Sequence, residues 1–127
     1  MFTAGVLRPL RARHYLVGDF GDESTPHSHP YRVELVARTA ALDANGFSTD
    51  IAAMEAVLEE VLGSIDDVLL NDLRWFADRQ PSLENLAVYL VERIREGLCA
   101  RGAAPDEPLE IRIWENENAW AAYLEAR

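Results

Sequence analysis

The chain has 127 residues, the size of one domain, and 49% of them are hydrophobic, which is enough for a core and excludes general disorder. Its 12 basic and 22 acidic residues give a net charge of −10. A nucleic-acid partner is therefore not expected, because phosphate binding needs clustered basic side chains. No apolar run reaches the roughly 20 residues of a membrane span, so no membrane partner is expected either.

The types of polar residue limit the chemistry further. All 12 basic residues are arginines, so a Schiff-base lysine and a Walker A loop are excluded. Cys99 is the only cysteine and cannot form an internal disulfide. We expect it to be a small, half-buried helix residue without a chemical role. The N-terminus lacks the uninterrupted apolar segment of a signal peptide, and we expect a cytoplasmic protein.

Two strands are predicted in the first third of the chain. Residues 31–42 begin with an alternation of apolar and polar side chains, which indicates a strand with one buried side. Residues 2–17 form a looser strand of the same kind, with Leu10, Ala12 and His14 on one face. The connection between the two strands is rich in Gly, Asp, Ser and Pro, as is typical of a loop.

Two helices follow these strands. Apolar residues recur at helical spacing over residues 51–63, and Ser48 or Thr49 is expected to cap this helix. Residues 64–80 are predicted to hold a connection with a turn or two of helix. A second helix is predicted to begin in the segment PSLE, at residues 81–84, and Gly102 is expected to close it.

The C-terminal part returns to strand patterns. Residues 109–113 alternate as a third strand, and residues 119–125 form a fourth strand or a short final helix. We therefore predict an α+β fold in one domain spanning residues 1–127, an antiparallel sheet of four strands with two helices packed on one face. The two open sheet edges favour a homo-oligomer.

The only histidines are His14, His27 and His29. His27 and His29 are two residues apart and point to the same side of an extended backbone. If the first two strands form a hairpin, His14 can reach that side as well. Three imidazoles with a vacant fourth position describe a catalytic Zn²⁺ site, although Fe²⁺, Ni²⁺ or Co²⁺ would also accept them. The alternative is two loop histidines without a metal.

Six short segments follow one another in a fixed order: Arg11–Leu16 (RARHYL), His27–Tyr31 (HSHPY), Leu42–Asp50 (LDANGFSTD), Ile65–Asn71 (IDDVLLN), Pro81–Ala87 (PSLENLA) and Ile111–Glu115 (IRIWE), with Tyr123 behind them. In this combination the chain resembles the 6-pyruvoyl-tetrahydropterin synthase / 6-carboxytetrahydropterin synthase family, of the tunnelling-fold (T-fold) superfamily. The resemblance covers nearly the whole chain. It implies a trimer whose sheets join into a barrel, and two trimers stacked as a hexamer.

The resemblance also implies roles for individual residues. His14, His27 and His29 would hold zinc, and Glu115 would bind the 2-amino-pyrimidinone edge of a pterin. A carboxylate suits that edge because it accepts two parallel N–H bonds. Ser82, in the segment PSLENLA, is the second expected substrate contact. Without the family, Glu115 would be interpreted as a solvated residue of the run ENEN.

The chain departs from the family at the proton-transferring residues. Glu23 stands where the synthases have a cysteine, and family variants with glutamate there cleave the side chain of dihydroneopterin triphosphate. Asp66 and Asp67 stand in place of an Asp-His pair. An ionised Asp67 cannot donate and accept as a neutral imidazole does, unless burial beside Asp66 raises its pKa. Solvated carboxylates are the alternative for all three residues.

Three functions remain open. The first is a zinc-dependent pterin synthase or lyase that acts on the side chain of dihydroneopterin triphosphate or a related pterin. In it, Glu23 would move the proton, with Asp66 or Asp67 assisting. The second is a catalytically altered homologue that binds zinc and a pterin. The third is a lyase for a different small substrate.

Overall fold

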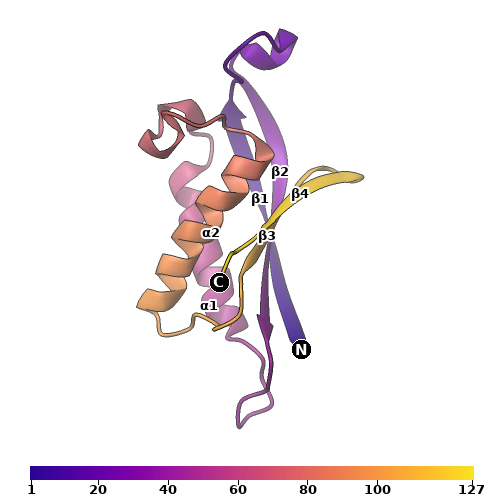
Figure 1. The fold of residues 1–127 in the computed structure, drawn as a ribbon, viewed down its shortest axis with the longest axis vertical. Helices are drawn as coiled ribbons and strands as arrows, with labels where there is room; N and C mark the ends of the chain where they lie inside the picture. Colours follow the sequence, from indigo (N-terminus) through magenta and orange to yellow (C-terminus); the bar gives the residue numbers. More distant parts are fainter.

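Four antiparallel strands form one sheet in the order β1-β2-β3-β4. The computed structural model describes residues 1–127, and Figure 1 shows the sheet beside two helices. The elements are β1 (Phe2–His14), β2 (His27–Thr39), α1 (Ile51–Ile65), α2 (Leu83–Ala100), β3 (Glu110–Asn116) and β4 (Ala119–Leu124), with short 3₁₀ turns η1 (Gly21–Ser24), η2 (Leu70–Asp72) and η3 (Arg74–Phe76). The predicted α+β arrangement is confirmed.

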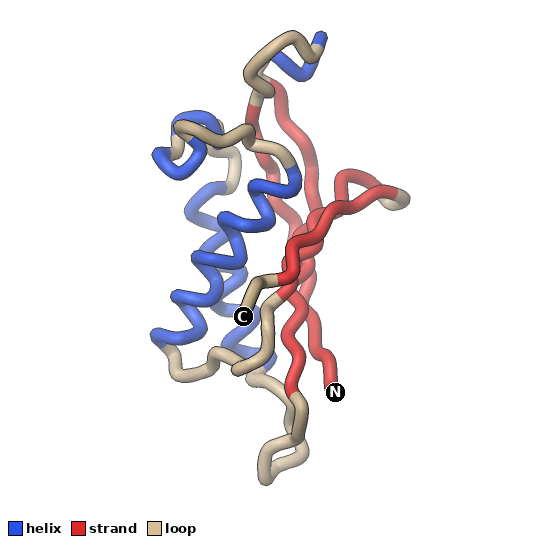
Figure 2. Tube along the Cα trace, viewed as in Figure 1, coloured by secondary structure: helices blue, strands red, loops and turns tan.

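Both helices lie on the same side of the sheet (Figure 2). The alternation along each strand turns one row of apolar side chains toward them, and burial of each large apolar side chain is worth about 1.5–3 kcal/mol. The core residues include Leu10, Val33, Leu35, Ile111 and Ile113 of the strands and Met54, Leu58, Leu86, Leu90 and Ile94 of the helices. This single core fixes how the first hairpin stands against α2.

Both strands of the first hairpin differ from the prediction at the end next to the turn. β1 and β2 pair in one continuous register, and their last pair is His14 with His27. β2 therefore begins at His27 rather than at residue 31, and β1 ends at His14 rather than at residue 17. β1 ends at His14 because the next residue, Tyr15, bonds to the side chain of Asn71 and not to β2. Asn71 accepts from the N–H of Tyr15 and donates to its carbonyl, at 2.9 Å each.

The helix ends are capped by side chains. Asp50, and not the predicted Ser48 or Thr49, is the N-cap of α1, where its carboxylate accepts a backbone N–H bond from the first turn. Ser82 does the same for α2. Gly102 follows the end of α2 with φ of +66°, the left-handed conformation expected of a closing glycine.

The C-terminal segment is a strand and not a helix. β4 pairs with β3 from Glu110 with Leu124 to Asn116 with Ala119, and the register shifts between Trp114 and Asn116. The shift leaves the residue between them, Glu115, outside the regular pairing. Cys99, expected to be half-buried, is exposed on α2.

Two strand edges remain open in the single chain, because β1 and β4 lie at the ends of the sheet. Part of the β1 edge is covered by the chain itself: Arg13 bridges to Leu69, and the Asp67 N–H donates to the carbonyl of Arg11 at 2.8 Å. Oligomerisation through the remaining edges stays a prediction. Neither helix is long and apolar enough to cross a bilayer.

Candidate metal centre

The three histidines meet at the end of the first hairpin. His14 and His27 are directly opposite in the ladder, and His29 is two residues further on the same face. The ring centroids lie 4.7 Å apart for His14 and His27, 5.1 Å for His14 and His29, and 4.7 Å for His27 and His29. The hairpin on which the prediction depended thus brings all three rings together.

Backbone carbonyls select the tautomer of two of these rings. His14 Nδ1 lies 2.6 Å from the carbonyl oxygen of Pro81, and His27 Nδ1 lies 2.7 Å from that of Thr25. A carbonyl can only accept, so each Nδ1 carries the hydrogen in the neutral ring and each Nε2 presents its lone pair. Both Nε2 atoms are buried and have no hydrogen-bond partner.

The buried position of His14 keeps its ring neutral. Only 5% of the residue is exposed. Burial lowers the pKa of His14, the bond to Pro81 partly offsets this, and the neighbouring His27 and His29 lower it further. A neutral imidazole is the form that binds a metal ion.

Tyr31 supports the ring of His29. Its ring stacks on that of His29 with the planes 9° apart and the centroids at 5.1 Å, and it meets His14 edge-on at 6.4 Å. Burial, followed by the charges of Glu115, Glu23 and Glu84, raises the pKa of Tyr31. The phenol is thus a neutral wall of the site.

Glu23 approaches the histidines from the hairpin loop. It lies in η1, where its backbone carbonyl accepts from the N–H of Leu16 at 2.7 Å. One carboxylate oxygen, Oε2, lies 2.8 Å from Nε2 of His27 and 3.9 Å from Nε2 of His29. One ligand atom from each of these four residues, His14 included, lies within 4.8 Å of all the others.

The donor set fits a transition-metal ion. A buried imidazole nitrogen without a partner, as Nε2 of His14 is, costs free energy in the absence of a ligand. Imidazole suits Zn²⁺ and other ions of its series, and three histidines are a common catalytic zinc set. The residues present therefore fit the metal that the sequence predicted.

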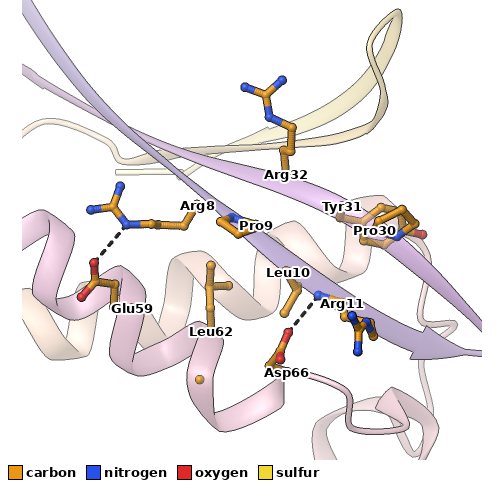
Figure 3. Close-up of a pocket in the computed structure, with 11 residues that line it drawn as sticks. Arg8, Pro9, Leu10, Arg11, Pro30, Tyr31, Arg32, Glu59, Leu62 and Asp66 are labelled. Atoms are coloured by element: carbon orange, nitrogen blue, oxygen red, sulfur yellow. Dashed lines mark hydrogen bonds and ion pairs between the residues drawn. The ribbon is translucent and has the colours of Figure 1, made fainter.

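The two aspartates lie elsewhere in the chain. Asp66 follows α1, and its Oδ1 accepts the backbone N–H of Arg11 at 2.9 Å, as Figure 3 shows. Asp67 is exposed and has φ of +58°. Neither belongs to the group of possible metal ligands, so within one chain they are part of the connection from α1 to the β1 edge.

A hollow lies next to this connection. It has a volume of about 680 Å³ between β1 and α1, and Tyr31 and Asp66 are among its lining residues. Figure 3 shows Arg8 directed toward Glu59 of α1, and Arg32 on the other side of the strands. The histidines do not line it, so the hollow and the metal site share only the wall formed by Tyr31.

The two expected pterin contacts have different positions. Ser82 caps α2 and is the neighbour of Pro81, the residue that holds His14. Glu115 is exposed at the irregularity of β3, and its charge acts on Tyr31. Both remain predictions as substrate contacts.

The sequence did not indicate three contributors to the site. Pro81 and Thr25 contribute through their backbone carbonyls. Every residue has a backbone carbonyl, so the residue type does not indicate this role. Tyr31 falls in the segment HSHPY, where the alternation predicts only a strand residue. Its place two residues after His29, on the same face of a strand, was the available signal.

Comparison with known proteins places these observations in a family. The family model described as 6-pyruvoyl tetrahydropterin synthase matches residues 6–126. The 6-pyruvoyl tetrahydrobiopterin synthase of Poecilia reticulata is 31% identical over 99 residues, which are 76% of this chain and 64% of that protein. The chain thus spans less than two thirds of that relative's length.

Solved structures show the same fold. The 6-pyruvoyl tetrahydropterin synthase of Caenorhabditis elegans superimposes with a TM-score of 0.82 at 20% identity, covering 98% of this chain and 96% of that one. A Plasmodium vivax 6-pyruvoyltetrahydropterin synthase, in which a catalytic glutamate is replaced by cysteine, gives 0.72 at 13% identity, with 98% and 99% covered. These likenesses show the T-fold.

Proposed function

Since the chain belongs to the 6-pyruvoyl tetrahydropterin synthase family, we propose that it is a zinc-dependent enzyme of pterin metabolism. Its substrate is dihydroneopterin triphosphate or a related pterin, and the reaction is a synthase or lyase reaction on the side chain of that molecule. One observation supports this best: three histidines converge beside the carboxylate of Glu23, and the buried Nε2 of His14 has no hydrogen-bond partner there.

His14, His27 and His29 hold the metal in this proposal. A bound Zn²⁺ ion polarises hydroxyl or carbonyl oxygens of a substrate side chain. Pro81 and Thr25 fix two of the rings, and Tyr31 limits the third. Because His14 is buried at the floor of the site, substrate is expected to enter from the side of Glu23, whose side chain is 49% exposed.

Glu23 is the proposed proton acceptor. A carboxylate that moves a proton from carbon must lie near the substrate carbon, and Glu23 is the acidic residue that lies against the histidines. The Plasmodium vivax relative, in which a glutamate is the catalytic residue, supports this assignment by analogy. Asp66 and Asp67 are assigned an assisting role, and Glu115 and Ser82 bind the pterin.

These remaining roles depend on assembly. In one chain, the Asp66 carboxylate is bound to the backbone of Arg11. Asp66 and Asp67 therefore assist only if a homo-oligomer, a trimer or a hexamer, brings them to a site of a neighbouring subunit. Glu115 would then equally serve the zinc of a neighbour.

The test begins with the metal. Protein purified without chelators or a histidine tag is expected to contain about one zinc per chain by plasma mass spectrometry, as expected for a single three-histidine site. His27→Ala is expected to lose that zinc. Protein that takes up no metal even when supplied with it would refute the proposal.

Turnover is the second part of the test. Wild-type protein is incubated with dihydroneopterin triphosphate, and pterin products are separated by chromatography. Glu23→Gln is expected to abolish the product, and full activity of this variant would remove Glu23 from the mechanism. Asp22→Asn, in the same turn, is the matched control and is expected to remain active.

A second function is favoured by Asp67, which stands where the family has histidine. With Asp66 bound to Arg11 and Asp67 exposed, the pair lacks the imidazole that assists proton transfer. A zinc- and pterin-binding protein without turnover would retain everything else at the site. Tight pterin binding without product, across several pterins, would identify this function.

A further inference from the structure

We propose that Glu23 is itself a metal ligand in the substrate-free protein, so that the site at rest is a closed set of three histidines and one carboxylate. The inference rests on the proposed metal site. It goes beyond that proposal because it assigns Glu23 to the fourth position, the place that a catalytic zinc site keeps for water or substrate.

The spacing of the ligand atoms supports this assignment. Four ligands at zinc-binding distances of about 2.0–2.1 Å, arranged as a tetrahedron, lie about 3.3–3.4 Å from one another. Glu23 Oε2 is 2.8 Å from one histidine nitrogen and 3.9 Å from another. These two distances fall on either side of the tetrahedral value, as they do for a carboxylate oxygen directed at the same point as the rings.

The chemistry of the facing atoms supports it as well. His27 donates from Nδ1 to the carbonyl of Thr25, so its neutral ring presents only a lone pair at Nε2. An ionised carboxylate is also only an acceptor. Nε2 of His27 and Oε2 of Glu23 lie 2.8 Å apart. Two lone-pair atoms this close are held together by a cation, either a proton on the ring or a metal ion that both atoms ligate.

The turn that holds Glu23 places the carboxylate there through its backbone. Glu23 accepts from Leu16 N–H and donates its own N–H to the carbonyl of Phe20 at 3.3 Å. Ser24 closes the same loop by donating to the carbonyl of Gly18 at 2.7 Å and accepting from Phe20 N–H at 2.9 Å. The backbone is thus fixed while the half-exposed side chain has room to turn away from the histidines.

A closed resting site gives Glu23 two successive positions. Beside the histidines it completes the ligand set and excludes water. Turned away, it leaves the fourth position to an oxygen of the substrate and becomes a free carboxylate next to the carbon chain, where a base is required. The residue that replaces the family's cysteine therefore controls access to the metal as well as the proton.

Metal affinity and ligand field test this without turnover. The Kd for Zn²⁺ is measured by competition with a coloured chelator. Removal of a residue that only hydrogen-bonds to a metal ligand weakens metal affinity by about ten-fold or more. Glu23→Ala and Glu23→Gln, which remove a ligand, are therefore expected to weaken Zn²⁺ binding at least about ten-fold. Asp22→Asn, one residue earlier in η1 and outside the ligand group, is the matched control and is expected to bind like wild type.

The Co²⁺-loaded protein supplies the second readout. Azide is expected to leave the visible absorption of wild type and Asp22→Asn unchanged, because Glu23 occupies the fourth position. In Glu23→Ala it is expected to alter the spectrum by binding at the open position. Circular dichroism of the metal-free variants confirms that they are folded, since Glu23 is a loop residue outside the core.

The outcomes separate this inference from the proposed function. Equal Zn²⁺ affinity in wild type and both Glu23 variants, together with a wild-type spectrum that responds to azide, would overturn it even if Glu23→Gln lost turnover. Weakened affinity in both variants would support it even if wild type converted no pterin, in which case only the proposed function fails. If wild type binds no metal, both fail.

Discussion

The Nδ1 atom of His14 and the carbonyl oxygen of Pro81 are 2.6 Å apart and connect the last residue of β1 to the residue two before α2 begins. This contact spans 67 positions of sequence. It selects the ring form of His14 that presents Nε2 to the candidate metal site, because a carbonyl accepts only an N–H. The core that packs α2 against the sheet therefore also sets the chemistry of a ligand.

Metal removal is expected to destabilise the protein. An ion that binds only the folded chain stabilises it by about 2.7 kcal/mol when its free concentration is 100 times its Kd. Addition of a strong chelator should lower the Tm measured by differential scanning calorimetry, and Zn²⁺ should restore it. His29→Ala is the control in which chelator and Zn²⁺ are expected to have little effect. A Tm of wild type that is insensitive to both would contradict a metal site.

Two substitutions of Tyr31 distinguish the role of its ring from the role of its hydroxyl group. Tyr31→Phe keeps the stack on His29 and is expected to bind Zn²⁺ like wild type. Tyr31→Leu loses the stack, and since aromatic pairs are worth about 0.5–1.5 kcal/mol, the Zn²⁺ affinity is expected to fall by about two- to ten-fold. Chelator competition measures both. Equal affinity in the two variants would show that His29 needs no such support.

Two glycines in the helices are expected to respond in opposite directions to the same substitution. A Cβ atom on Gly97 of α2 would lie 2.6 Å from Cγ1 of Val57 on α1, whereas one on Gly63 of α1 would meet nothing within 4 Å. Gly97→Ala is expected to cost about 1–3 kcal/mol by overpacking. Gly63→Ala is expected to add up to about 1 kcal/mol through helix propensity.

Urea unfolding measures both changes, and Gly63→Ala is the matched control. In Gly97→Ala, truncation of Val57 to alanine removes the clashing atom and should recover part of the loss, so that the two changes are not additive. A stabilised Gly97→Ala protein would show that the helices can move apart without cost.

Stability is expected to fall in acid through Glu110. Burial raises the pKa of Glu110, but hydrogen bonds from Arg112 and Arg38 outweigh it and hold the pKa below its ordinary value of 4.5. A lowered pKa contributes stability that is complete above the unfolded value of 4.5 and is lost as the pH falls through the lower folded value. The loss therefore begins only below about pH 5.

Urea unfolding of metal-free protein between neutral pH and pH 4 tests this, because removal of the metal leaves out the protonation of its ligands. Glu110→Gln is expected to be less stable at neutral pH and to show a weaker pH dependence. Glu117→Gln, on the exposed turn after β3, is expected to match wild type. An unchanged pH dependence in Glu110→Gln would assign the acid sensitivity to other groups, such as Glu125 with Arg95.

Periodicity in the sequence determined the elements and their layers. The alternation around Leu10 and Val33, and the helical spacing around Leu58 and Leu90, follow from which side chains must leave water, and a two-layer α+β fold satisfies them. The pairing of histidines was accessible for the same reason. In a hairpin, residues that share a face are known once the register is known.

Several local features were not accessible from periodicity. The cap of α1 is Asp50, the residue directly before the helix, and an error of one or two positions in a cap is invisible to a pattern that repeats every 3.6 residues. The strand ends at His14 because Asn71, far along the chain, satisfies Tyr15. Such a bond depends on tertiary packing, and the sequence pattern around Tyr15 does not indicate it.

The sequence by itself determined that His14, His27 and His29 share one face of a hairpin and that Glu23 lies in its loop, because strand alternation and chain connectivity are local properties. Only the tertiary structure decided that Pro81 fixes the His14 ring, that Asp66 is bound to Arg11, and that the Glu23 carboxylate reaches the histidine nitrogens. These are contacts of backbone carbonyls, N–H groups and folded loops. Such contacts depend on how distant segments are placed in the folded chain, which the type of each single residue does not determine.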